Sequence, residues 1–99
     1  MKLRHNLVME TFYRPDLDKE KAIAIARERI TPEGIKKKGY KAKVDLFGDQ
    51  LKISGKGFDI NLYFENTSVT GNLKLSLILR PAQGKIKKEI QSVMDSLFG

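Results

Sequence analysis

The single histidine of this 99-residue chain, His5, is the first candidate for catalysis or metal binding. A catalytic histidine needs a nucleophile or an orienting carboxylate beside it, and a zinc site needs at least three protein ligands. The chain has no cysteine, which excludes thiolate ligands, thiol nucleophiles and disulfides. His5 lies on the inward side of an expected N-terminal strand, so we interpret it as a packed, hydrogen-bonded residue.

Glycines and carboxylates offer no better catalytic pattern. The segment Gly55-Lys56-Gly57 falls between two expected strands, whereas a phosphate-binding loop must open a helix whose N–H groups face the anion. We therefore interpret it as a turn. The twelve Asp and Glu residues show no spacing that pairs an acid with a base on one helical face. We expect no enzyme activity and no catalytic, cofactor-binding or metal-binding residues.

The charge balance is the strongest compositional signal. Nineteen Lys and Arg against twelve Asp and Glu give a net charge of +7. Such a balance favours anionic partners such as nucleic acid, phospholipid headgroups or an acidic protein. A solvated, soluble surface explains it as well. The lysines cluster at 36–43 and again at 85–88.

The first half of the chain predicts one strand and two helices. Residues 2–9 alternate imperfectly and suit a strand. Asp18 is placed to cap an amphipathic helix whose apolar positions include Ala22 and Ala26. Thr31-Pro32 interrupts that helix, and we expect a short second helix over 32–38 that Thr31 caps and Gly39 ends.

The second half predicts four strands and a final helix. Apolar and polar residues alternate over 40–46, 51–54, 58–64 and 69–79, with short Gly, Asn and Asp turns between them. Arg80-Pro81 then opens a helix with a narrow apolar stripe. The fold class is therefore α+β: one domain over 1–99 with a single antiparallel sheet, the order β-α-β-β-β-β-α, and both helices on one face. This order is analogous to the TATA-binding-protein-like and helix-grip folds, which implies nothing about activity.

The outward side of this sheet is the candidate interaction surface. Together with the lysines of the 36–43 cluster it presents a polar, basic surface on which Tyr63 is the one expected aromatic, whereas RNA-reading sheets carry several. The residues of this candidate surface are Lys36, Lys37, Lys38, Lys41, Lys43, Lys52, Tyr63 and Lys74. Asp45 and Asp59 share the outer face, where lysines are expected to neutralise them.

Several short motifs along the chain resemble those of the putative polyhydroxyalkanoic acid system family, small bacterial proteins associated with storage-polyester metabolism. The matching segments are His5, Leu17-Asp18-Lys19-Glu20-Lys21-Ala22, Gly48-Asp49-Gln50-Leu51, Gly55-Lys56-Gly57-Phe58, Leu77-Ile78-Leu79-Arg80-Pro81, Gly84-Lys85-Ile86-Lys87-Lys88-Glu89-Ile90 and Met94-Asp95-Ser96-Leu97-Phe98-Gly99. The interruption around Thr31-Pro32-Glu33-Gly34 departs from the single helix expected there. The resemblance implies a role at or near polyester granules and implies no catalytic residues.

Three hypotheses follow. The first is a non-enzymatic binding or interaction protein of the polyhydroxyalkanoate storage system, whose partner is another protein such as one that coats the granule. The second is a basic module that binds nucleic acid, weakly and nonspecifically, through the open sheet face and the 36–43 lysines. The third, a small-ligand binder, conflicts with a thin core, since ligand pockets usually measure about 300 Å³ or more.

The apolar runs of the chain are short, which bears on its expected location. No apolar run approaches the roughly 20 residues of a bilayer-spanning helix, and no apolar stretch follows the basic start, so we expect neither a transmembrane segment nor a signal peptide. The expected location is the cytoplasm, with the granule surface as the site that the resemblance implies. Exposed apolar anchors for that surface are few, and the candidates are Ile78, Phe98 and Ile25.

Overall fold

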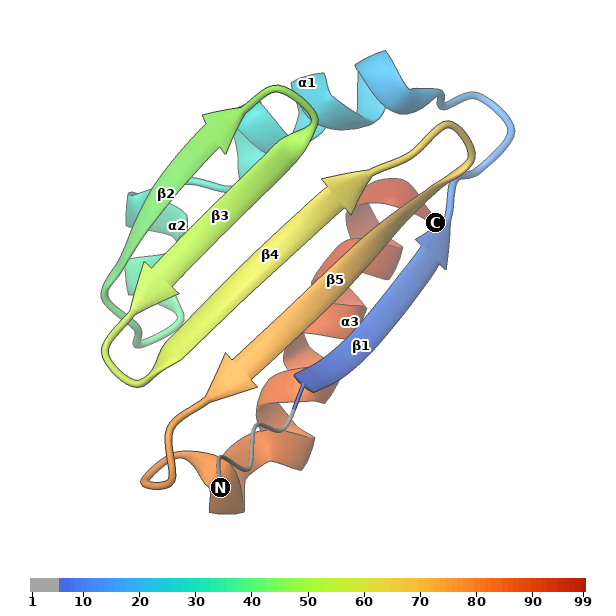
Figure 1. Ribbon diagram of the computed structural model, residues 1–99. Coiled ribbons are helices and arrows are strands. Elements are labelled where there is room, and N and C mark those ends of the chain that lie inside the picture. Colours follow the sequence, from blue (N-terminus) through green and yellow to red (C-terminus); the bar gives the residue numbers. More distant parts are fainter. Residues whose placement is uncertain (1–5) are drawn as a thin grey trace.

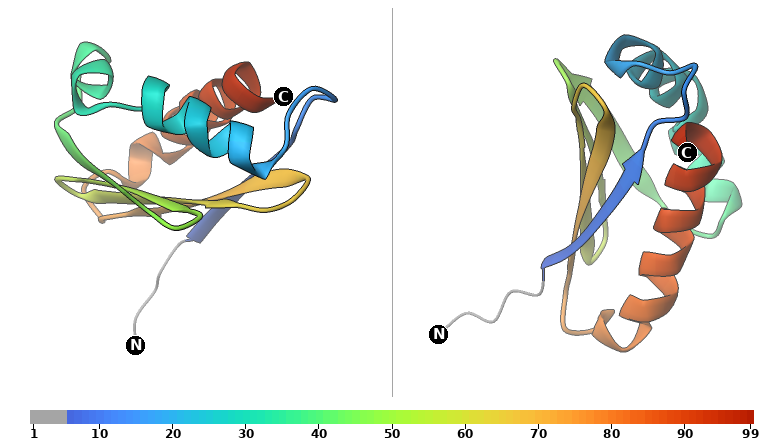
Figure 2. Two further views of the ribbon diagram at one scale, coloured as in Figure 1. Left: turned by 90° about the horizontal axis from the view of Figure 1, so that it is seen from above. Right: turned by 90° about the vertical axis from the view of Figure 1, so that its right-hand side faces the viewer.

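The computed structural model describes residues 6–99 as one antiparallel sheet covered on one face by helices (Figures 1 and 2). His5 lies outside the described residues. The elements in chain order are β1 (Asn6–Phe12), α1 (Lys19–Arg29), α2 (Pro32–Lys37), β2 (Ala42–Phe47), β3 (Gln50–Gly55), β4 (Phe58–Phe64), β5 (Ser68–Leu75), a short 3-10 helix (Arg80–Ala82) and α3 (Gln83–Phe98). The α+β class and the single antiparallel sheet are confirmed.

The sheet has the strand order β1-β5-β4-β3-β2. Strands β2 to β5 form a meander in which each pairs with the next, and β1 returns to pair with β5 at the far edge. The register sets one residue from each strand in a row across the sheet, for example Leu46, Leu51, Leu62, Gly71 and Met9 on the inner face. Because side chains alternate along each strand, every second row faces the helices.

Local sequence signals explain where the first two helices begin. The Asp18 carboxylate accepts a hydrogen bond from the backbone N–H of Lys21 at 2.9 Å, and the Thr31 hydroxyl accepts one from that of Gly34 at 3.1 Å. Both predicted N-caps are therefore confirmed. Gly39 follows α2 with φ = 96°, a conformation that glycine adopts without a steric penalty.

The core lies between the inner sheet face and the helices. Helix α1 contributes Ala22 and Ala26, which have no exposed surface, so small side chains let this helix approach the sheet closely. Helix α3 crosses the same face and buries Ile86, Met94 and Phe98. At the rim, Lys19 Nζ of α1 lies 2.9 Å from Asp49 Oδ2 in the β2–β3 turn. This pairing lowers the pKa of Asp49, chiefly through the hydrogen bond from Lys19.

Most strand boundaries lie within two residues of the prediction, but the ends of β1 and β5 differ by more. Strand β1 continues past Met9 to Phe12, because Thr11 and Phe12 still pair with Val69 and Ser68. Strand β5 ends at Leu75 and not at Leu79. Its neighbour β4 begins at Phe58, the partner of Leu75, so within residues 6–99 no strand lies beside residues 76–79. They form a turn in which the Leu79 N–H donates to the Ser76 carbonyl.

Of the three predicted apolar anchors, only Ile78 is well exposed. Ile78, in this turn, is 87% exposed, as expected of an anchor. Phe98 is fully buried instead, and Ile25 packs partly against the core. Leu77, assigned by alternation to the inner face, is 74% exposed because the strand has already ended.

Candidate functional site

The eight residues of the predicted interaction surface fall on two sides of the sheet. Lys43, Lys52, Tyr63 and Lys74 lie on the outer face, which no helix covers (Figure 2). Lys36 and Lys37 belong to α2, and Lys38 caps its C-terminal end, on the helix-covered side. Lys41 is exposed in the segment that leads into β2. The structure therefore does not bring the lysine cluster and the outer face together as one surface.

The register pairs opposite charges on the outer face. Asp45 lies directly across from Lys52, and Asp59 directly across from Lys74. Cross-strand pairs of opposite charge stabilise a sheet modestly. They also cancel much of the positive potential that a polyanion would require. The expectation that lysines balance Asp45 and Asp59 on this face is thus supported by their positions.

Exposed apolar side chains on the outer face are more numerous than alternation predicted. Phe47 lies in the same cross-strand row as Tyr63, with Gln50 of β3 between them. Phe12 and Val8 project from β1 at the opposite edge, and all four side chains are exposed. The outer-face group is defined as Val8, Phe12, Phe47 and Tyr63. Phe12 and Phe47 lie beyond the predicted strand ends at Met9 and Leu46, so sequence reasoning did not place them on this face.

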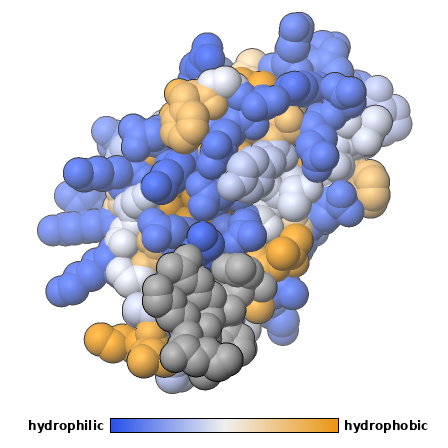
Figure 3. Space-filling view, in the orientation of Figure 1, coloured by the Kyte–Doolittle hydropathy of each residue, from blue (hydrophilic) through white to orange (hydrophobic). Residues whose placement is uncertain are grey.

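Figure 3 shows this outer face as largely hydrophilic, with apolar residues set apart from one another. The strand order explains the separation, since β3 intervenes between Phe47 and Tyr63, and β5 intervenes between Tyr63 and Phe12. Isolated apolar residues are normal on protein surfaces, whereas a continuous patch marks a surface that adsorbs. The arrangement suits a protein–protein interface of mixed polar and apolar character better than a surface that adsorbs to an apolar material.

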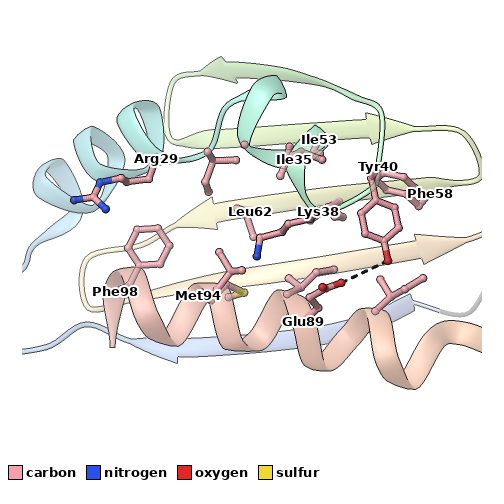
Figure 4. A pocket seen from close by; sticks show the side chains of 16 residues that line it. Arg29, Ile35, Lys38, Tyr40, Ile53, Phe58, Leu62, Glu89, Met94 and Phe98 are labelled. Carbon is pink, nitrogen blue, oxygen red and sulfur yellow. Dashed lines mark hydrogen bonds between the residues drawn. The ribbon is translucent and has the colours of Figure 1, made fainter.

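On the helix side, an apolar groove opens between α1–α2 and α3 (Figure 4). Its volume is about 230 Å³, and its lining is almost wholly apolar. The floor is the inner sheet face at Ile53, Ile60 and Leu62, while Ile35 of α2 and Ile90 of α3 form facing walls. The groove is smaller than the roughly 300 Å³ usual for ligand pockets, in keeping with the expected thin core, and it is present because α1 and α3 diverge over the sheet (Figure 1).

Polar groups stand only at the rim of this groove. Lys38 and Arg29 line the α1–α2 side, and both are exposed, but the Arg29 guanidinium points away from the groove (Figure 4). Across the rim, the Tyr40 hydroxyl donates a hydrogen bond to Glu89 Oε1 at 3.5 Å. Within residues 6–99, no carboxylate lies within ion-pairing distance of Lys38. In Figure 4 the Lys38 side chain runs from α2 toward α3 and ends over the groove.

A comparison with protein families shows which family the chain belongs to. A family described as putative polyhydroxyalkanoic acid system protein matches residues 14–98, which extend from the end of β1 through α3. The chain belongs to this family. No curated protein and no solved structure matches the chain. The family resemblance drawn from short motifs is confirmed, and the Thr31-Pro32 interruption does not remove it.

For this member of the polyhydroxyalkanoic acid system family, two further observations bear on chemistry. Among residues 6–99, no three His, Cys, Asp or Glu side chains are grouped so as to hold a metal ion. Within the same residues, none of the helices has the length and apolarity needed to cross a bilayer. The two candidate functional features that the structure does provide are the outer-face group and the apolar groove.

Proposed function

We propose that this chain is a non-enzymatic binding protein of the polyhydroxyalkanoate storage system that acts at the granule surface. Family membership supports the involvement in that system. The observation that carries the binding role is the open outer face of the sheet, with four exposed apolar side chains set among paired charges. Protein interfaces are enriched in aromatic residues surrounded by a polar rim, and their overall apolar fraction resembles that of other surfaces.

The proposed partner is a protein that coats the granule, and not the polymer itself. Adsorption to a polyester surface requires contiguous apolar area. The outer-face group offers separated side chains, and the exposed pair Leu77 and Ile78 lies off the sheet in the turn before α3. Docking onto a coat protein would use Phe47 and Tyr63 as anchors and the Asp45–Lys52 and Asp59–Lys74 pairs as a polar surround.

Granule flotation tests this proposal. Granules from a polyester-producing host are floated with the protein bound, then stripped of coat proteins and offered the protein again. We expect the protein in the granule fraction before stripping and little rebinding afterwards. The double variant Phe47→Ala/Tyr63→Ala should bind coated granules at least tenfold more weakly, since aromatic anchors carry much of interface affinity. The control, Leu77→Ala/Ile78→Ala, removes two apolar side chains that are even more exposed than Phe47 and Tyr63, and it should bind normally.

Two outcomes contradict the proposal separately. Absence of the wild-type protein from the granule fraction argues against a role at the granule. Undiminished binding to stripped granules refutes docking through a coat protein and indicates direct adsorption to the polymer.

Binding of nucleic acid is the second candidate function, and one observation favours it. Lys36, Lys37 and Lys41 are all exposed, and within residues 6–99 none of them is in an ion pair. The outer face supports it less, because Lys52 and Lys74 lie opposite carboxylates and only Lys43, opposite Ser54, does not. Electrostatic attraction of this kind gives binding without sequence preference.

A further inference from the structure

We infer that the apolar groove is a binding site for the unbranched acyl chain of a medium-length carboxylic acid, with the carboxylate held by Lys38 at the rim. This inference goes beyond the proposed docking function, which uses the opposite side of the sheet. It is drawn from the size of the groove, from its lining, and from the placement of charge at its rim.

The volume selects the length of the chain. An apolar protein cavity of about 150 Å³ binds benzene, which has six carbon atoms. By the same ratio, a groove of about 230 Å³ receives roughly nine carbon atoms. A helix is excluded as the occupant, because one helical turn, about 5.4 Å long and about 10 Å across, occupies roughly 400 Å³. A linear chain of eight to ten carbons therefore matches the groove.

The lining requires that the part of the ligand inside the groove be apolar. Floor residues Ile53, Ile60 and Leu62 and wall residue Met94 are nearly inaccessible to solvent and carry no hydrogen-bonding group in their side chains. A polar ligand group placed among them would lose its hydrogen bonds to water without replacement, which costs several kcal/mol in apolar surroundings. The polar end of any ligand must therefore remain at the rim.

The rim selects the sign of that polar end. The charged lining residues are Lys38, Arg29 and Glu89, and Glu89 already accepts the hydrogen bond from Tyr40. The Arg29 guanidinium points away from the groove (Figure 4). Arg29 is partly engaged, since its Nε lies 3.3 Å from Glu28 Oε1. Lys38 has no such partner among residues 6–99 and ends over the groove (Figure 4). An anionic head is the complement of this arrangement, and Lys38 is its principal contact.

The test titrates decanoate into the full chain and follows backbone amide signals by NMR, below the concentration at which decanoate aggregates. We expect saturable shifts that centre on Ile35, Ile86 and Ile90. Decanol, of equal chain length but uncharged, should bind more weakly. Butyrate should not saturate. A comparison of decanoate with each enantiomer of 3-hydroxydecanoate then distinguishes a free fatty acid from a hydroxyalkanoate as the source, and either ranking supports the site.

Two matched pairs of variants locate the ligand. Lys38→Glu should weaken decanoate roughly three- to tenfold, as expected for reversal of one surface charge, and should leave decanol unchanged. Lys37→Glu alters net charge equally, does not line the groove, and should have little effect on either ligand. Val93→Phe fills the groove and should abolish saturable binding, whereas Ser92→Phe adds the same ring to an exposed position of α3 and should not.

Three results would overturn the inference. They are the absence of saturable decanoate binding, equal effects of Lys37→Glu and Lys38→Glu, and normal binding by a folded Val93→Phe variant. If Val93→Phe fails to fold, the lysine pair still decides the question. Because the groove and the outer face are separate, Val93→Phe should leave granule docking intact, so failure of one proposal does not carry the other with it.

Discussion

The ring of Phe98 packs edge-on against the ring of Phe64, with 5.7 Å between the centroids and 81° between the planes. Phe98 is the last residue of α3, and Phe64 is the last residue of β4. Tyr13, just after β1, contacts Phe98 in a second edge-on arrangement at 6.4 Å. Three segments far apart in sequence therefore meet at the C-terminal turn of α3, which is part of the core.

Phe98→Ala should destabilise the protein by about 3–5 kcal/mol, because it removes a fully buried aromatic side chain and leaves a cavity. The matched control is Phe12→Ala, which removes the same ring from a side chain that is 67% exposed and should change stability by about 0.5 kcal/mol or less. Urea unfolding followed by circular dichroism gives both values. Equal effects of the two changes would show that the end of α3 does not pack as described.

Gly55→Ala should destabilise by about 1–3 kcal/mol, as expected for overpacking. A Cβ at Gly55 would lie 2.2 Å from Cζ of Phe58, its cross-strand partner, and 2.8 Å from the backbone oxygen of Lys41. Gly84→Ala is the control, since nothing lies within 4 Å of that Cβ and alanine favours a helix by about 0.5 kcal/mol or more. Thermal unfolding should move in opposite directions for the two variants, and a shared direction would contradict the assigned register.

Much of the fold was predictable because each local signal agreed with the next. Asp18 and Thr31 cap helices where their side chains predicted caps, and the period-two alternation of β2, β3 and β4 matches their buried faces. Leu77 shows where such reasoning fails. Alternation continues through Leu77 in the sequence, but a strand also needs a neighbour, and β4 has already turned back at Gly57.

The candidate sites were less predictable, for a physical reason. The groove exists because α1 and α3 diverge over the sheet, and the angle between two helices is set by packing and leaves no signature in either sequence segment. Ile35, Ile53 and Ile90 are apolar whether they fill a core or line a groove. Phe47 could have been found, because it continues the alternation of β2 by one residue onto the outer face.

Thr11→Val should cost about 1 kcal/mol, the usual net value of a hydrogen bond. The buried Thr11 hydroxyl donates to Asp95 Oδ1 at 2.7 Å and thereby joins β1 to α3, and the Gln91 amide donates to both groups. The control is Thr70→Val, which removes a bond of 2.9 Å to Glu65 at an exposed position and should cost less. Unfolding free energies compare the two, and a larger loss at Thr70 would contradict a structural role for the Thr11 bond.

Stability should fall in alkaline solution partly through Tyr13. Burial raises the pKa of Tyr13 to about 12, and the negative charges of Glu65 and Asp18 add to this while a backbone hydrogen bond at Glu65 opposes it. The folded state holds the proton more tightly than the unfolded state, whose pKa is near 10. The contribution is therefore complete below about pH 10 and is lost as pH rises toward 12.

Comparison of variants isolates this contribution, because lysines titrate over the same range. Tyr13→Phe should reduce the loss of stability between pH 9 and pH 11.5, measured from urea unfolding midpoints. Tyr63→Phe, at an exposed position, should follow the wild type. A wild-type pH slope in Tyr13→Phe would count against burial of the Tyr13 hydroxyl.

Any binding of single-stranded DNA or RNA should depend steeply on salt. Displacement of counterions by several lysines makes affinity fall strongly between about 50 and 200 mM salt. Lys36→Glu/Lys37→Glu should weaken binding and lower this slope without changing sequence preference. The control, Lys85→Glu/Lys87→Glu, makes the same change in net charge on α3 and should weaken binding less. A tight, sequence-selective complex at physiological salt would favour nucleic acid as the main partner.

The pairing of β1 with β5 has a consequence for the order in which the chain folds. Each strand of the β2–β5 meander meets its neighbour through a short turn, whereas Glu10 and Ser68, in contact between β1 and β5, are 58 residues apart. Closing so long a loop costs entropy before it gains contacts. The meander is therefore expected to form first, with β1 and α3 joining it late, held together by Thr11 and Asp95. Until that step, β5 is an unpaired edge, and the newly made chain is most exposed to self-association there.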